Sequence, residues 1–234
     1  MEEKALVLSS GGCDSTTCVS LAVKEYGKEN VSTVSFVYGQ KHDKEIASAK
    51  AVAKHYGLNH RIVNLTDCGI FDGSNCTLLK SGGDIEHESY AAQIEKTGGT
   101  VNTYVPFRNG LFLAAIAAVA MSEFPNDSVH VYIGAHADDA AGNAYADCSE
   151  RFVDAMAEAI SIGTYGSVKL EAPLVRKTKA EVVAVGLAIG TPYELTWSCY
   201  EGDDVQCGTC GTCLDRKAAF TANGVADPVC YGIE

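Results

Sequence analysis

The sequence predicts an α/β fold: a doubly wound parallel sheet followed by a small, cysteine-rich C-terminal segment. Short apolar runs alternate with helical patterns in the first half of the chain, and this alternation is typical of parallel sheets. Four of the ten cysteines fall between residues 199 and 213, after the alternation has ended. We therefore expect two parts: residues 1–197 form the sheet domain, and residues 198–234 pack on it.

The first half holds three expected strands separated by two expected helices. Residues 5–9 are apolar and end in Ser and Gly, as in a buried strand that feeds a glycine turn. The helical patterns stop at Gly27 and Gly57, where glycine suits a C-terminal cap. The expected order is strand 5–9, helix 15–26, strand 31–37, helix 42–56 and strand 60–65.

The second half is less regular. Residues 68–100 are rich in Gly, Ser and Asp, so we expect an insertion that lies over the functional site. The Ala-rich stretch at 111–121 predicts a buried helix, because it is too short to cross a bilayer. A strand at 128–133 and helices at 150–160 and 178–189 complete the prediction.

Composition restricts the partners and the compartment. The 30 acidic residues outnumber 18 basic ones, giving a net charge of −12, whereas proteins that hold long nucleic acids usually carry a basic stripe. We therefore expect no nucleic-acid partner. The charged N-terminus runs straight into an apolar strand, so we expect no secretion signal and no membrane association, and we place the protein in the cytoplasm. In that compartment, ten cysteines suit metal ligation and buried thiols better than disulfides.

A glycine-rich loop joins the first strand to the first helix, with the sequence Ser9-Ser10-Gly11-Gly12-Cys13-Asp14-Ser15-Thr16-Thr17. Glycine lets the backbone approach a ligand, and the amides and dipole at a helix N-terminus favour an anion. The hydroxyl groups add further donors. Because the loop lies at the carboxyl edge of the sheet, where such folds bind ligands, we expect it to hold phosphates.

The loop spacing matches neither common nucleotide pattern. It lacks the Gly-Lys-Ser/Thr of a Walker loop and the Gly-x-Gly-x-x-Gly of a dinucleotide loop. Two adjacent glycines alone would fit a simple tight turn, and only the whole string between strand and helix favours phosphate binding. Asp14, beside an expected triphosphate, suits a magnesium ligand or the partner of a magnesium-bound water.

Four cysteines near the C-terminus form a Cys-x7-Cys-x2-Cys-x2-Cys pattern: Cys199, Cys207, Cys210 and Cys213. Four thiolates at this spacing suit a tetrahedral zinc ion, which the protein would surround completely, so we expect a structural role. Zinc would then order a tail that has little apolar material of its own. An iron–sulfur cluster, a redox pair and free buried thiols are the alternatives, and we favour zinc over them.

The loop resembles the SGGxDS loop of the PP-loop ATP pyrophosphatases, which grips the terminal pyrophosphate of ATP. With the cysteine pattern, further segments make the chain similar to the 7-cyano-7-deazaguanine synthases from end to end. These segments are residues 38–42 (YGQKH) with Glu45, 104–109 (YVPFRN), 145–148 (YADC), 179–181 (KAE) and 194–200 (ELTWSCY). The chain departs from the family pattern at Phe107, where Gly is usual, and at Ala146, where Pro is usual.

The resemblance implies a carbon–nitrogen ligase of queuosine biosynthesis that converts 7-carboxy-7-deazaguanine and ammonia to 7-cyano-7-deazaguanine. The substrate carboxylate would attack the α-phosphorus of ATP, and ammonia would displace AMP to give an amide. A second adenylation and loss of AMP would leave the nitrile. ATP, with Mg²⁺, would be held by Leu8, Ser9, Ser10, Gly11, Gly12, Cys13, Asp14, Ser15, Thr16, Thr17 and Cys18.

The candidate catalytic residues are Arg108, Lys179, His42, His136 and Asp139. The two basic side chains would neutralise phosphate charge, although each would also fit a solvated surface. The histidines would transfer protons or bind substrate, since histidine titrates near neutral pH, although a lone histidine is more often a scaffold residue. Asp139, like Asp138 and Asp147, would bind magnesium or the purine-like edge of the substrate, or would belong to a polar loop.

Other interpretations of the sequence remain open. A related PP-loop enzyme could adenylate another acid to make an amide or conjugate, or could modify a tRNA, although the acidic net charge argues against tRNA. A zinc-stabilised nucleotide-binding module without catalysis is a further alternative. For the favoured interpretation we expect a homodimer that takes small-molecule substrates only. Ammonia would be free or come from a partner, because 234 residues leave no room for a glutaminase domain.

Overall fold

The computed structural model describes residues 2–41, 43–98, 101–141, 144–202 and 204–232. Its centre is a five-stranded sheet in the order β3-β2-β1-β4-β5, in which every pairing is parallel. The strands are β1 (Glu3–Leu8), β2 (Val31–Val37), β3 (Asn59–Asn64), β4 (Ser128–Tyr132) and β5 (Val168–Glu171). Since β1 lies between β2 and β4, the strand order reverses beside β1, and ligands bind at such a point in open α/β sheets.

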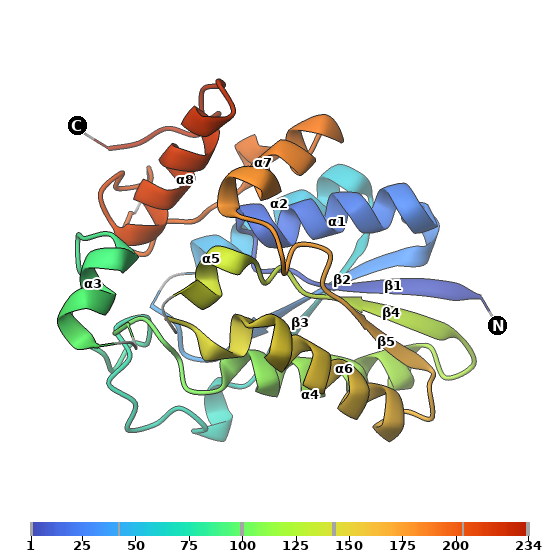
Figure 1. Ribbon diagram of the computed structural model, residues 1–234. Helices are drawn as coiled ribbons and strands as arrows, with labels where there is room; N and C mark the ends of the chain where they lie inside the picture. The colour runs from blue at the N-terminus through green and yellow to red at the C-terminus, as the bar shows by residue number, and fades with distance from the viewer. Residues whose placement is uncertain (1, 42, 99–100, 142–143, 203, 233–234) are drawn as a thin grey trace.

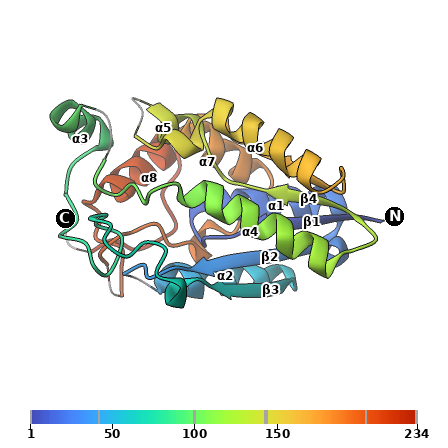
Figure 2. The same ribbon diagram turned by 90° about the horizontal axis from the view of Figure 1, so that it is seen from below.

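Helices cover both faces of the sheet, which confirms the predicted doubly wound fold (Figure 1). One face carries α1 (Cys13–Tyr26), α2 (Lys44–Tyr56) and α7 (Lys179–Ala188). The other carries α4 (Arg108–Glu123) and α6 (Glu150–Gly163), and Figure 2 shows α4 lying across the strands. Across the described residues, none of the helices combines the length and the apolar character that a bilayer crossing demands.

The burial of β1 explains why its sequence is a continuous apolar run. Ala5, Leu6 and Val7 are all fully buried. Leu6 belongs to the core under α4, with Leu113, whereas Ala5 and Val7 belong to the core under α1, with Val19. A parallel strand covered on both faces is expected to be apolar at every position.

Several elements escaped the sequence prediction. β5 contributes only four residues at the sheet edge, and they alternate Val, Lys, Leu and Glu. In the insertion, α3 (Tyr90–Thr97) begins at Ser89, whose side chain accepts a hydrogen bond from the Ala92 amide. Short helical segments also occur: α5 (Ala137–Ala140) and the 3₁₀ turns Lys28–Asn30, Thr66–Cys68, Ala146–Cys148 and Tyr193–Leu195.

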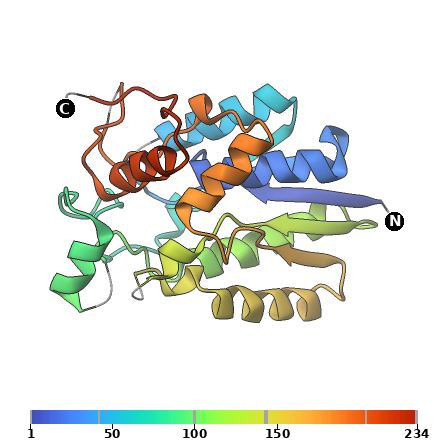
Figure 3. The ribbon, with the colours of Figure 1, turned by 45° about the horizontal axis from the view of Figure 1, so that its top comes forward.

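The C-terminal segment forms another unpredicted helix, α8 (Gly211–Ala222), which packs beside α7 (Figure 3). Ala219 and Phe220 are buried against Val183 and Tyr193. α8 therefore contributes a small apolar face of its own, which packs on α7. That zinc orders this tail stays a prediction.

Candidate active site

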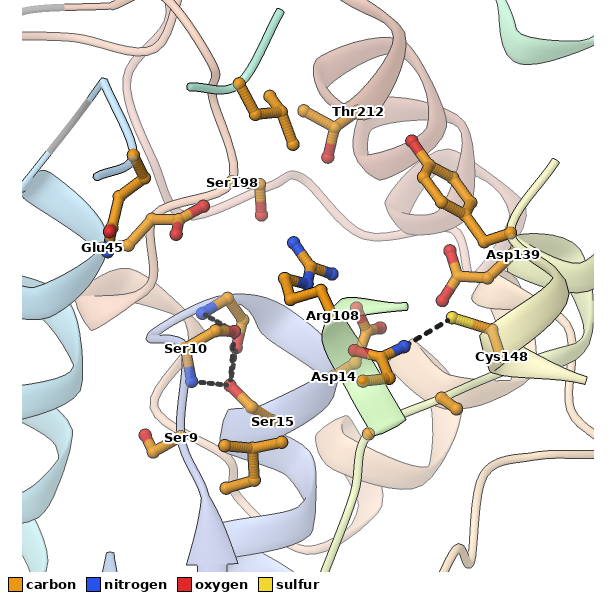
Figure 4. A pocket seen from close by; sticks show the side chains of 18 of the residues that line it. Ser9, Ser10, Asp14, Ser15, Glu45, Arg108, Asp139, Cys148, Ser198 and Thr212 are labelled. Carbon is orange, nitrogen blue, oxygen red and sulfur yellow. Dashed lines mark hydrogen bonds between the residues drawn. The ribbon is translucent and has the colours of Figure 1, made fainter. Parts of the chain in front are cut away.

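The carboxyl ends of β1, β2 and β4 open into one cavity (Figure 4). The glycine loop after β1 supplies one wall, and residues 133–136 after β4 supply another. The first turns of α2 and α4 contribute Glu45 and Arg108. Trp197 and, from the C-terminal segment, residues 198–200, Thr212 and Asp215 complete the lining. Segments far apart in the sequence thus meet where the fold is expected to bind its ligand.

Gly11 is a position of the glycine loop where a side chain would clash with neighbouring backbone. Its φ is +80°, and a Cβ at this position would lie 2.2 Å from the Glu45 carbonyl oxygen and 2.7 Å from the Ala49 nitrogen. The Gly11 carbonyl also accepts a hydrogen bond of 2.9 Å from the Trp197 amide. The loop is therefore fixed between the start of α2 and Trp197, which directly precedes the C-terminal segment.

The hydroxyl groups of the loop face one another at the start of α1. The Ser10 amide donates to Ser15 Oγ at 3.1 Å, and the two serine hydroxyls lie 3.0 Å apart. The first amides of a helix have no acceptor within the helix, so they are available to an anion. The buried Ser9 Oγ and His136 Nδ1, from residues that line the cavity, find no hydrogen-bond partner among the described residues, which fits a site for a polar ligand.

A cluster of charges lies beside the loop. Lys179 Nζ donates to both carboxylate oxygens of Asp14, at 2.7 and 2.6 Å. His136 Nε2 lies 3.8 Å from Asp14 and 3.3 Å from an oxygen of Asp139. Burial acts to raise the pKa of Asp14, but Lys179 and His136 hold it below the ordinary value. Burial acts to lower the pKa of Lys179, but Asp14 holds it above the ordinary value.

Arg108 lies at the first position of α4 and is directed into the cavity (Figure 4). Its Nη1 donates to the Tyr38 hydroxyl at 3.3 Å, a long bond that leaves other guanidinium donors free for a ligand. Phe107, which precedes it, has a φ of 53°, in the left-handed region that favours glycine. The position where the chain departs from the family pattern is thus one where a side chain strains the backbone.

Two of the candidate aspartates serve the scaffold. Asp138 accepts a hydrogen bond of 2.7 Å from the Lys179 amide, and so caps α7. Asp147 accepts one of 2.9 Å from the Asn109 amide at the start of α4. Asp139 instead faces the cavity, and burial raises its pKa.

The predicted ATP-binding string divides into two sets. The first set lines the cavity: Leu8, Ser9, Ser10, Gly12, Asp14 and Ser15. The second set does not line the cavity and is buried: Gly11, Cys13, Thr16, Thr17 and Cys18. Thr17 bonds the Cys13 carbonyl and the Tyr193 hydroxyl, and Cys18 bonds the Ile133 carbonyl. Of the candidate catalytic residues, Arg108, Lys179, His136 and Asp139 share the cavity. His42 lies outside the described residues.

Several cavity residues had no role in the sequence prediction, among them Glu45, Ser198, Thr212 and Asp215. Glu45 is named with a family segment in the sequence, but that resemblance assigns it no role. Thr212 and Asp215 lie three residues apart on α8, so they share one helix face. That spacing was visible, but the helix had not been predicted.

The four C-terminal cysteines come together in a metal-binding arrangement. Their Sγ atoms all lie within 4.8 Å of one another, and all ten cysteines are free thiols. The sulfurs of Cys207 and Cys213 are 3.9 Å apart, close to the separation of about 3.8 Å for ligands on a tetrahedral zinc with bonds of about 2.3 Å. The arrangement therefore fits one metal ion.

Hydrogen bonds favour the ionised form of the first of these cysteines. Cys199 Sγ accepts from the amides of Glu201, Gly202 and Cys207, at 3.4, 3.0 and 3.2 Å. The pKa of Cys199 is lowered by hydrogen bonds from the thiols of Cys210 and Cys213 and by these amides. A thiolate is the form that binds a metal.

The parallel doubly wound sheet and the SGGxDS-type loop at its centre define a PP-loop protein of the α/β class. Residues 4–224 match the family described as "Queuosine biosynthesis protein QueC". The chain belongs to this family.

Curated relatives resemble the chain over nearly its whole length. The 7-cyano-7-deazaguanine synthase of Caldicellulosiruptor saccharolyticus is 39% identical over 99% of this chain and 96% of its own. The enzyme of the same name from Archaeoglobus fulgidus is 39% identical over 97% of this chain and 89% of its own. Among solved structures, an NMN synthetase from Francisella tularensis is similar at 15% identity with a TM-score of 0.46, over 96% of this chain and 79% of that one; this likeness is too distant to bear on activity.

Proposed function

We propose that the chain is a carbon–nitrogen ligase that converts 7-carboxy-7-deazaguanine and ammonia to 7-cyano-7-deazaguanine with ATP. The observation that carries the proposal is the cavity, which joins the glycine loop to Arg108 and Lys179 in a member of this family. Relatives named for this product share 39% of residues with the chain. An acid that must be adenylated needs both an anion cradle and basic side chains beside it.

The proposed reaction uses the same cavity twice. The substrate carboxylate forms a bond to the α-phosphorus, pyrophosphate leaves, and ammonia then displaces AMP to give an amide. The amide oxygen is adenylated in turn, and AMP leaves with the remaining N–H protons released to water, so that the nitrile forms. The loop amides, Ser10 and Ser15 would hold the departing pyrophosphate and position the α-phosphorus.

The charged side chains would stabilise the negative charge of the phosphates. Lys179 is held by Asp14 in the structure, and it would turn to the phosphates when they occupy the loop. The free donors of Arg108 would contact the substrate carboxylate and the α-phosphate. Asp14 and Asp139 offer the oxygen ligands that Mg²⁺ prefers, and a bound Mg²⁺ would neutralise phosphate charge.

The four-cysteine site would hold zinc in a structural role, because the protein supplies four thiolates and no position stays open. Cys199 also lines the cavity, so this site supports the cavity wall. We place the enzyme in the cytoplasm, where ATP is abundant and thiols stay reduced. We also propose a homodimer acting on small molecules only, which light scattering will test.

In the decisive experiment, the protein is incubated with ATP, Mg²⁺, ammonium and 7-carboxy-7-deazaguanine, and the products are identified by mass analysis. We expect pyrophosphate, AMP and the nitrile. Accumulation of the amide alone would favour the amide-forming paralogue, and ATP binding without AMP formation would favour a non-catalytic module.

A matched pair of variants tests the role of the cavity lysine. Lys179→Met should lower kcat/KM by about a hundredfold or more, because it removes a charge placed against the transition state. Lys24→Met makes the same change on an exposed residue in the last turn of α1 and should leave activity unchanged. Equal effects of the two substitutions would contradict the assignment.

A further inference from the structure

Glu45 is separate from the other acidic residues of the cavity. It is the second residue of α2, and it lines the cavity on the side away from Asp139 and Cys148 (Figure 4). Within the described parts of the chain, no hydrogen bond or ion pair occupies its carboxylate. Burial raises the pKa of Glu45 to about 7, opposed by the Arg108 guanidinium.

The other carboxylates of the site are already engaged or lie at the phosphate end. Asp215 lies near Lys179 and His136, whose charges act on it, so it belongs to the cluster beside the loop. Two further carboxylates are paired: Asp14 with Lys179 and Asp139 with His136. Glu45 is therefore the carboxylate best placed to bind a neutral, donor-rich part of a ligand.

An ionised carboxylate can distinguish the two ring systems of the proposed reaction, which are the deazaguanine and the adenine of ATP. A deazaguanine presents two adjacent donors, N1–H and the 2-amino group, and both can bond to one carboxylate. Adenine presents one amino donor beside an acceptor nitrogen, which matches a carboxylate poorly. Two N–H donors would also favour the charged form that burial disfavours.

The surroundings of Glu45 suit a planar ring. Ile46, Leu78 and Trp197 line the same cavity and supply apolar surface. Lys44 Nζ, from the residue before Glu45 on α2, lies 5.9 Å from the centre of the Trp197 ring, so the indole lies near this end of the cavity. Arg108 is available for an anionic group of the same ligand.

We infer that Glu45 is a specificity-determining residue that binds the N1–H and 2-amino edge of 7-carboxy-7-deazaguanine, while Arg108 faces the carboxylate. The inference rests on the proposed function, and it adds the residue that distinguishes this substrate from other planar acids. Replacing the Glu45 carboxylate by an amide would lose a charge-assisted pair of hydrogen bonds. Binding of the deazaguanine acid should therefore weaken by about ten- to a hundredfold.

The test compares the wild type with Glu45→Gln and with Asp43→Asn, which removes one negative charge from the exposed N-cap position of the same helix. For Glu45→Gln we expect KM for the deazaguanine acid to rise about ten- to a hundredfold, with KM for ATP and kcat nearly unchanged. Asp43→Asn should behave as the wild type. An analogue of the acid without the 2-amino group should bind both the wild type and Glu45→Gln weakly, with little difference between them.

Several results would overturn the inference. If Glu45→Gln leaves KM for the deazaguanine acid unchanged, Glu45 does not bind that acid. A raised KM for ATP would show instead that Glu45 binds adenine, and a raised KM for ammonium would show that it binds the amine. Thermal unfolding of Glu45→Gln, expected at or above the wild-type temperature, checks that the fold is retained. A wild type that forms no AMP with the acid would defeat the proposed function itself, whereas an active wild type with an unaffected Glu45→Gln variant would defeat this inference alone.

Discussion

At the scale of single residues, Gly11 illustrates how backbone geometry limits the glycine loop. Its positive φ and the nearby backbone atoms of Glu45 and Ala49 leave no space for a Cβ. We predict that Gly11→Ala lowers the free energy of unfolding by about 2–4 kcal/mol, since it adds overpacking to backbone strain. Urea denaturation measures the change.

Gly57 provides the matched control for this prediction. It has a φ of +71°, but a Cβ there would meet nothing within 4 Å. Gly57→Ala should therefore show the conformational penalty alone, about 1 kcal/mol. If the two substitutions are equally mild, the loop is more adaptable than its contacts indicate.

Glu45 should also leave a signature in the pH dependence of stability. Its folded-state pKa of about 7 exceeds the value of about 4.3 expected in the unfolded chain, so the folded protein binds the extra proton. The free energy of unfolding therefore falls as pH rises between these two values. We predict that Glu45→Gln is more stable than the wild type at pH 8, by on the order of 2 kcal/mol after allowance for solvent in the cavity, and that this gain shrinks toward pH 5.

Urea titrations of both proteins at pH 5 and pH 8 measure that difference. Any metal-linked effect of pH is common to the two proteins and cancels. A constant difference across this range would mean that Glu45 titrates as an ordinary surface carboxylate.

At the scale of elements, α8 is held by a buried ion pair as well as by apolar packing. Arg216 is fully buried, and its Nε and Nη2 contact the two oxygens of Asp227 at 2.7 and 2.9 Å. We predict that Arg216→Met lowers the free energy of unfolding by about 3–5 kcal/mol, because it leaves Asp227 as an uncompensated buried charge.

An exposed pair between α6 and the turn that follows β5 supplies the comparison. Arg176 also contacts a carboxylate, that of Glu150, but its side chain is 79% exposed. Arg176→Met should change stability by less than about 1 kcal/mol. Denaturation of both variants under the same conditions tests whether burial, not pairing, sets the effect.

The elements that could be predicted are those whose sequence carries its own periodicity. β1, β2, α4 and α7 have apolar runs or helical spacing that tertiary contacts then reinforce. β5 has two polar residues in four, and α8 combines glycine, charged residues and one metal-site cysteine, Cys213, in its first turn. Their order depends on neighbours, namely β4 for the strand and α7 for the helix, which no local pattern reveals.

The site residues also fall into those that local sequence spacing identifies and those that only the fold brings together. The loop and the cysteine cluster are contiguous in sequence, so their spacing was informative. Glu45, Thr212 and Asp215 reach the cavity only because the first turns of α2 and α8 lie beside the glycine loop in the folded chain. Sequence analysis could not assign them for that reason.

At the scale of the whole molecule, the metal site and the cavity are one structure. Cys199 lines the cavity, and Thr212 follows the ligand-cluster residue Cys210 by two positions on α8. We predict that Cys207→Ser, or removal of the metal by a chelator, lowers the melting temperature and also abolishes most of the thermal shift that ATP produces. Differential scanning fluorimetry with metal analysis measures both effects.

Cys68→Ser is the control, because Cys68 is exposed and lies outside the cluster. It should retain the metal and the full ATP-dependent shift. If the metal-free protein keeps the ATP-dependent thermal shift, the part of the cavity formed by the C-terminal segment does not need the metal. That result would contradict the structural role assigned to zinc.

The hydrogen bond between Gly11 and Trp197 joins the beginning of the chain to its last part. The glycine loop and the segment that begins at Trp197 therefore hold each other in place. A displacement of either one would be transmitted directly to the other, although 185 residues of sequence separate the two bonded residues.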